Sequence, residues 1–232
     1  VQPPRLTLDN YDLLVSHINA MYFLEAGIHI SSSITDIIDE HDLKKLPIKA
    51  ELWTKLIDGH ETRKKTIMDY VERLLMMDTT LSEVLDLNQA EKIIDNAPKA
   101  FDNAFIRWRR LYKNAIKLRD DSRAIIDNPI YSSKSDEKKQ AERSESFAKK
   151  QFIQLRNDDS KNSFSEFYPF RYLASEGFLP GYNFTKLPIR VAINGYETTE
   201  YLSRPRSIAL SEYGPRNIIY HNGQSYEIKR IN

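Results

Sequence analysis

The residue types that support catalysis or metal binding form no recognisable motif along this chain. It has no cysteine, which excludes disulfides, thiolate nucleophiles and cysteine-based zinc or iron–sulfur sites. It also contains no Gly-rich phosphate loop and no nucleophile-elbow sequence around a serine. The five histidines lack an i, i+4 pair or an acidic partner at ligand spacing, so we expect ordinary core or surface residues; they are His17, His29, His41, His60 and His221. The sequence therefore predicts no catalytic residue, no metal and no cofactor.

Cations interleaved with aromatic residues near the C-terminus are the strongest indication of a binding function. Aromatic faces stack on unpaired bases while cations hold the phosphate backbone, as in small β-modules that bind single strands. Two of the cations, Arg204 and Arg206, flank a proline that stiffens the loop between them. The candidate nucleic-acid-binding residues are Arg171, Arg190, Arg204, Arg206, Arg216, Tyr182 and Tyr220. The alternative is that the aromatic residues are simply the core of a domain rich in Phe and Tyr.

A second basic face is expected on a long helix from Lys99 to about Ile126. Phe101, Phe105, Trp108 and related residues fall on one stripe of that helix, and most of its cations lie away from the stripe. Arg109, Arg110, Lys113 and Lys117 could follow successive phosphates. The alternative is a solvated face whose cations pair with Asp102, Asp120 and Asp121.

Length and composition favour two domains, or one domain with an appendage, in a globular chain. The 232 residues include 34 Lys and Arg against 33 Asp and Glu, so the net charge of +1 points to no particular partner. No apolar run approaches the length of a membrane span, and no signal peptide is evident, so we expect a cytoplasmic protein without a membrane partner. The chain opens on Val1 and its first methionine is Met21, so we expect either a part of something longer or a chain that has lost its leader.

The elements that must position these residues change in character near residue 160. Residues 1–160 show helical periodicity, for example from Glu61 to Met77, and predict a helical bundle. Within it, the charged segment of about 132–146 is expected to be either a solvated helix or a mobile loop. The stretch from Tyr168 to Pro188 looks too punctuated by proline and glycine for a helix, and too aromatic for a linker.

Residues 161–232 predict a small antiparallel β-rich module. The expected strands are 187–193, turned by Asn194-Gly195, then 196–202, 207–212, and a hairpin of 217–221 and 224–231 turned by Asn222-Gly223. The predicted fold class is therefore α+β, with an N-terminal helical bundle followed by a small, barrel-like antiparallel β-module.

Segments near both ends of the chain resemble a known family. They are residues 9–28, 170–184, 201–206 and 211–226. These segments look like the accessory, non-motor region of large bacterial superfamily 2 DEAD/DEAH-box helicases, closest to the helicase subunit of DISARM-type anti-phage defence systems.

The resemblance implies a parent protein that is an ATP-dependent DNA helicase. On that basis we expect this region to contribute to DNA binding or motor regulation, with DNA, the RecA-like motor lobes of the same chain and a partner defence subunit as its partners. The motor motifs themselves are absent here, so the resemblance transfers no catalytic role to any residue. The alternative is a protein–protein adaptor that docks a partner subunit or the motor lobes.

Overall fold

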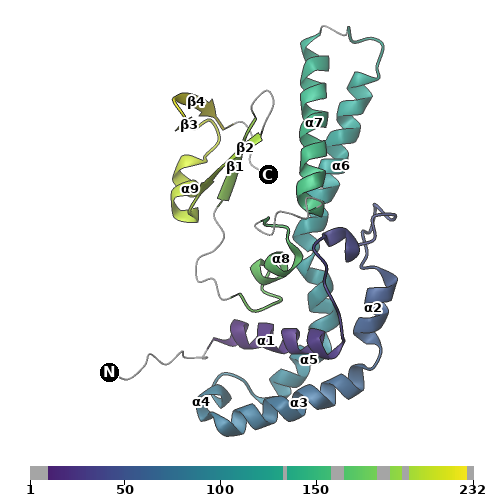
Figure 1. Cartoon of the computed structure of the whole chain (residues 1–232), viewed down its shortest axis with the longest axis vertical. Helices are drawn as coiled ribbons and strands as arrows, with labels where there is room; N and C mark the ends of the chain where they lie inside the picture. The colour runs from purple at the N-terminus through teal and green to yellow at the C-terminus, as the bar shows by residue number, and fades with distance from the viewer. Residues whose placement is uncertain (1–9, 133–134, 158–164, 182–188, 195–198, 229–232) are drawn as a thin grey trace. The chain divides into compact units, whose positions relative to one another are not determined.

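The computed structural model describes residues 10–132, 135–157, 165–181, 189–194 and 199–228 (Figure 1). Two compact units divide the chain, Val1–Gly181 and Tyr182–Asn232. Each has a hydrophobic cluster of its own, large in the first unit and small in the second. We refer to them as the helical unit and the small unit.

The elements follow one another from a run of helices into short strands. The helical unit contains α1 (Tyr11–Glu25), the 3-10 helix η1 (Ile34–Asp36), α2 (Ala50–Ile57), α3 (His60–Met77), α4 (Thr79–Ser82), α5 (Leu87–Ala104), α6 (Ile106–Ile126), α7 (Asp136–Arg156) and α8 (Pro169–Ser175). The small unit contains β1 (Ile189–Asn194), β2 (Thr199–Arg204), α9 (Arg206–Glu212), β3 (Ile218–His221) and β4 (Gln224–Glu227). The mostly helical content with antiparallel strand pairs is compatible with the predicted α+β class.

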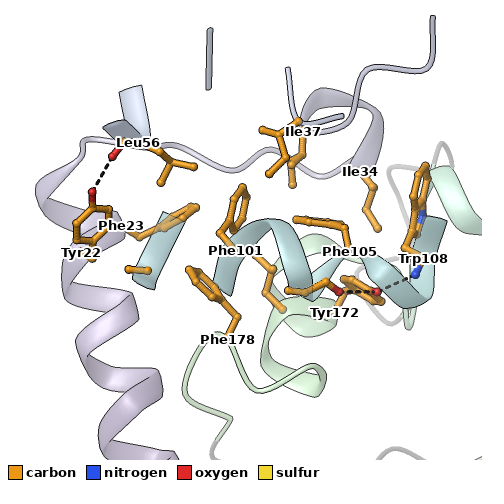
Figure 2. Close-up of a cluster of buried hydrophobic side chains, with 14 of the residues drawn as sticks. Tyr22, Phe23, Ile34, Ile37, Leu56, Phe101, Phe105, Trp108, Tyr172 and Phe178 are labelled. Atoms are coloured by element: carbon orange, nitrogen blue, oxygen red, sulfur yellow. Dashed lines mark hydrogen bonds between the residues drawn. The ribbon is translucent and has the colours of Figure 1, made fainter. Parts of the chain in front are cut away.

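Aromatic side chains fill the core of the helical unit. Phe101 of α5 packs against Phe23 of α1 and against Phe178, with ring centroids 4.6 and 5.3 Å apart (Figure 2). Further along, Trp108 stacks on Tyr112 at 4.7 Å. The stripe predicted from the spacing of these residues is therefore buried, as expected.

The single long helix predicted from Lys99 to Ile126 is wrong, because the buried Tyr172 interrupts it. Its hydroxyl accepts a hydrogen bond from the Trp108 amide at 3.1 Å and donates one to the Ala104 carbonyl at 3.0 Å (Figure 2). These two backbone groups are an i, i+4 pair that would otherwise bond each other. A side chain inserted into this ladder breaks or bends a helix. The result is two helices, α5 and α6, that meet at Phe105.

The stretch from Tyr168 to Pro188, predicted to be non-helical, forms α8 over its first part. Pro169 occupies the first turn of α8, where its missing N–H is no loss. Leu173 and Phe178 join the core of the helical unit. This packing places residues 165–181 with the helices, so the compact units divide after Gly181 instead of near residue 160.

The charged segment of about 132–146 forms the first half of α7. Ser135 caps this helix by accepting from the Lys138 amide at 3.2 Å. Ala141 and Ala148 are buried in α7, whereas its charged residues lie mostly toward solvent. The helical alternative therefore describes this segment, and α7 packs antiparallel along α6 as Figure 1 shows.

The small unit consists of two antiparallel hairpins with a helix between them. In the first, Ile189 pairs with Arg204; in the second, Ile218 pairs with Glu227. Asn222 and Gly223 have φ values of 50° and 75°, which confirms the predicted tight turn. Gly195 of the other predicted turn lies outside the described residues.

Two predictions for the small unit are corrected. Residues 207–212, expected to be a strand, belong to helix α9. Ala209 of this helix and Tyr213, which caps its C-terminus, are at i, i+4 spacing and are both buried. The barrel-like closure is also wrong, since the described strands form two separate two-stranded sheets. The strand that was expected between the two hairpins is replaced by helix α9.

Candidate nucleic-acid interface

Arg204, the last residue of β2, is partly engaged within the small unit. Its Nε donates to the Glu212 carboxylate at 3.0 Å, which ties the end of β2 to the end of α9. About a third of its side chain stays exposed. Pro205 caps α9 in an extended conformation, so Arg206 begins a helix and is exposed there. The proline therefore separates a partly exposed cation at the end of β2 from a more exposed one at the start of α9.

Arg216 and Tyr220 lie on either side of the start of the second hairpin. Arg216 has a φ of 68°, and its amide donates to the Ile228 carbonyl at 3.0 Å, so the backbone is fixed while the side chain is exposed. Tyr220 is 77% exposed, because β3 buries only Ile219 between its two outward neighbours. An exposed cation and an exposed aromatic ring are the two kinds of group that bind the phosphates and the unpaired bases of a single strand.

The remaining candidates lie on other parts of the chain. Arg190 lies opposite Ser203 in the ladder of the first hairpin. Arg171 belongs to α8 of the helical unit, half-buried. Tyr182 lies outside the described residues. Within the described chain, the predicted set is thus divided between two units.

Of the two units, the small unit is the one with a net positive charge. Residues 182–232 include seven Lys and Arg against four Asp and Glu, a formal net charge of +3. The helical unit, although more than three times as long, has a formal net charge of −2. A polyanion is therefore attracted to the small unit more strongly than the near-neutral whole chain suggests.

The basic face of α6 divides into paired and unpaired cations. Arg109 is mostly buried; it donates to the Leu46 and Asp102 carbonyls and forms an ion pair with the Asp102 carboxylate at 2.5 Å. Arg119 pairs with Asp120 at 2.9 Å. Both cations therefore pair with the aspartates named in the alternative, although Arg109 is mostly buried and not solvated. Arg110, Lys113 and Lys117 make no ion pair with the described residues.

Arg107 at the start of α6 has a structural role that the sequence did not suggest. It pairs with Glu176 at 2.6 Å and Glu166 at 3.0 Å, and it lies 5.2 Å from the ring centre of Tyr172. Burial alone lowers the pKa of Arg107, but the two carboxylates outweigh this and raise it. Burial also raises the pKa of the Tyr172 hydroxyl, so that both groups keep their protons at neutral pH.

A triad of titratable side chains joins α1, α3 and α5. The Tyr22 hydroxyl lies 2.8 Å from Nδ1 of His60, whose Nε2 lies 3.1 Å from the Asp95 carboxylate. Tyr22 is fully buried and its hydroxyl donates to the Leu56 carbonyl at 2.7 Å, so this hydroxyl is hydrogen-bonded within the core. The triad therefore braces the fold, and burial raises the pKa of Tyr22. Its bonded neighbours are 38 and 35 residues apart in the sequence, so no local motif could have indicated it.

A hollow of about 470 Å³ lies between η1, the loop that follows it and the facing parts of α6 and α7. Its charged wall is self-neutralised: Arg156 pairs with Glu40 at 2.9 Å and donates to the Tyr112 hydroxyl at 2.7 Å. Burial raises the pKa of Tyr112 to about 12. No group of three metal-ligating side chains occurs among the described residues.

Comparisons with protein families, with curated proteins and with solved structures found no match to this chain. Among the helices that the structure describes, none is both long enough and apolar enough to cross a membrane.

Proposed function

We propose that this chain is a non-catalytic, nucleic-acid-binding accessory part of an ATP-dependent DNA helicase or translocase. The observation that carries the proposal is the concentration of positive charge, formally +3, in the 51 residues of the small unit. The exposed side chains of Arg206, Arg216 and Tyr220 add the cation and ring chemistry that binds a single strand.

The helicase parent rests on the resemblance of segments at both ends of the chain to the accessory region of superfamily 2 helicases. ATP binding and hydrolysis then belong to RecA-like motor lobes elsewhere in the parent, and this region assists DNA engagement or motor regulation. A cytoplasmic location, a partner defence subunit and a role in phage defence belong to the same proposal.

The test measures binding to single-stranded DNA at several salt concentrations. We expect the double variant Arg204→Ala/Arg206→Ala to weaken binding and to lower the slope of log affinity against log salt by up to about 2. Glu212→Gln supplies the opposite change, because it releases Arg204 from its ion pair, and should strengthen binding. Unchanged affinity and slope in both variants would count against the proposal.

A second candidate function, a protein–protein adaptor, is favoured by one observation on the same unit. Leu210 is 80% exposed, Ile218 is 58% exposed and Tyr220 is 77% exposed. Docking through such side chains tolerates salt, whereas binding to a phosphate backbone weakens steeply as salt rises. Binding of isolated motor lobes that persists in high salt and is lost in Leu210→Ser/Tyr220→Ala would favour the adaptor.

A further inference from the structure

Charge within the helical unit is strongly segregated onto the antiparallel pair of helices α6 and α7. These two helices contain thirteen Lys and Arg against six Asp and Glu. The other residues of 1–181 contain fourteen against twenty-three. A formal charge of +7 on one helical hairpin therefore lies within a unit whose total is negative, and the whole-unit charge conceals it.

Four of the seven cations of α6 form ion pairs within the helical unit. Arg107 is held by Glu166 and Glu176, Arg109 by Asp102, Arg119 by Asp120 and Arg123 by Glu145. The other three, Arg110, Lys113 and Lys117, are exposed and make no ion pair with any described residue. We call these three residues the α6 row.

The α6 row forms a line on one side of the helix. At 100° per residue its members fall within a sector of about 60°, opposite the buried Trp108, Tyr112 and Ala115. Successive members are separated by about 4.5 and 6 Å along the axis. Asp120 and Asp121 end the positive stretch on the C-terminal side. The row therefore presents three cations at regular intervals on a rigid support.

Among the described residues of α6 and α7, no aromatic side chain is exposed, and Phe147 of α7 is half-buried. The most exposed large apolar side chains of α6 and α7 are aliphatic, Ile106 and Ile153. Trp108, Tyr112 and Phe152 are buried. Binding of single strands depends on exposed rings as well as cations, whereas a duplex keeps its bases stacked on one another and offers mainly phosphates to a helix face.

From this geometry we infer that the α6 row binds the phosphate backbone of duplex DNA, without reading its sequence. The inference rests on the proposed function and deepens it, because it assigns a different form of DNA to the helical unit than to the small unit. Contacts of this kind are electrostatic and release condensed counterions, so they should be equally strong on any sequence and weaken with salt.

The experiment compares two triple variants of the full chain that lose the same charge. Arg110→Gln/Lys113→Gln/Lys117→Gln removes the α6 row. Lys55→Gln/Lys65→Gln/Lys92→Gln is the matched control, since these lysines are also exposed and without an ion pair to a described residue, but lie on α2, α3 and α5. Fluorescence anisotropy with labelled duplex DNA, single-stranded DNA and poly-L-glutamate reports binding, and circular dichroism checks that both variants fold.

We expect loss of the α6 row to weaken duplex binding about tenfold or more near 0.1 M salt and to lower the salt slope by up to about 3. Single-stranded DNA binding should stay within about twofold of the wild type, and the control variant should bind duplex DNA like the wild type.

Equal loss of duplex binding in the control variant, or an unchanged salt slope for duplex binding in the row variant, would overturn the inference. A row variant that loses poly-L-glutamate but keeps duplex would also overturn it, in favour of an acidic protein partner. If the wild type binds no DNA at all, the proposed function itself fails; if only the Arg204→Ala/Arg206→Ala effect is seen, the function stands and the α6 row is excluded.

Discussion

Arg107 shows how one side chain can hold together segments that are far apart in the sequence. It lies at the start of α6, whereas its partners Glu166 and Glu176 come from the residues around α8, 59 and 69 positions later. Its guanidinium also faces the rings of Phe167 and Tyr172. Because the charge is partly buried, removing it leaves two carboxylates close together without a cation.

We expect Arg107→Ala to lower the free energy of unfolding by about 1 to 2 kcal/mol, reduced from the fully buried case because a third of the side chain is exposed. Arg110→Ala is the control, since Arg110 is on the same helix, exposed and without an ion pair to a described residue. Its effect should stay within about 0.5 kcal/mol. Urea denaturation measures both, and equal effects would show that the pairs of Arg107 are not stabilising.

Asp95 makes stability depend on pH at the acidic end. Lys64 bonds its carboxylate at 2.8 Å, and this contact, with a smaller one from His60, holds the pKa of Asp95 below its ordinary 3.8. The folded state therefore binds fewer protons than the unfolded state at intermediate pH. The contribution is complete above the unfolded pKa and is lost as pH falls through the folded pKa.

Asp95→Asn tests this linkage. At pH 7 the variant should be less stable than the wild type by about 0.5 to 1 kcal/mol, because the carboxylate is nearly half exposed. The difference should shrink toward zero as the pH falls from about 5 to 2. Thermal melts of both proteins across this range give the comparison, and a difference that is constant with pH would contradict the assignment.

At the scale of elements, the junction between α5 and α6 is set by a hydroxyl from another part of the chain. Nothing in the sequence near Phe105 is a helix breaker, and Pro98 lies inside α5 without ending it. The break occurs where Tyr172 satisfies both the Ala104 carbonyl and the Trp108 amide. Its position therefore depends on how α8 packs, not on local helix propensity.

Tyr172→Phe should destabilise the helical unit by about 1 to 2 kcal/mol, because it leaves a buried carbonyl and a buried amide without their shared partner. The ring and its stacking against Phe105 are kept in the variant. Tyr70→Phe is the matched control on α3, where the tyrosine is exposed, and should have almost no effect. If Tyr172→Phe is as stable as the wild type, the helix closes its own hydrogen bond there.

For the whole molecule, the two units should unfold separately because each has its own hydrophobic cluster. The cluster of the small unit contains six buried residues, among them Leu202 and Ile219, and so few buried side chains give marginal stability. The helical unit buries a much larger set, including Ile94 and Trp108.

We expect two unfolding transitions, with the small unit unfolding first. Leu202→Ala should lower only the first transition, and Ile94→Ala only the second, each by about 2 to 4 kcal/mol. Hydrogen exchange followed by segment assigns each transition to its unit. A single transition that both variants lower by equal amounts would show that the two units are energetically coupled.

The sequence by itself determined the elements whose signal is local. Apolar spacing indicated the helix of Glu61 to Met77, and Asn222-Gly223 indicated the last hairpin, because a period of 3.6 or a positive φ is written in neighbouring residues. It also supplied the candidate cations and the absence of cysteine chemistry. The strand predicted for residues 207–212 was wrong, since a short apolar run fits a strand or a helix equally well.

Only the tertiary structure decided which of these residues remain available for binding. The cations of α6 look alike in sequence, yet Arg109 is taken by Asp102 and Leu46 while Arg110 is not. The tertiary structure also places Arg171 in the helical unit, and it shows that Tyr172 interrupts the long helix near Phe105. The reason in each case is the same. Ion pairs, buried hydroxyls and unit boundaries depend on partners far away in the chain, and local sequence patterns do not identify these partners.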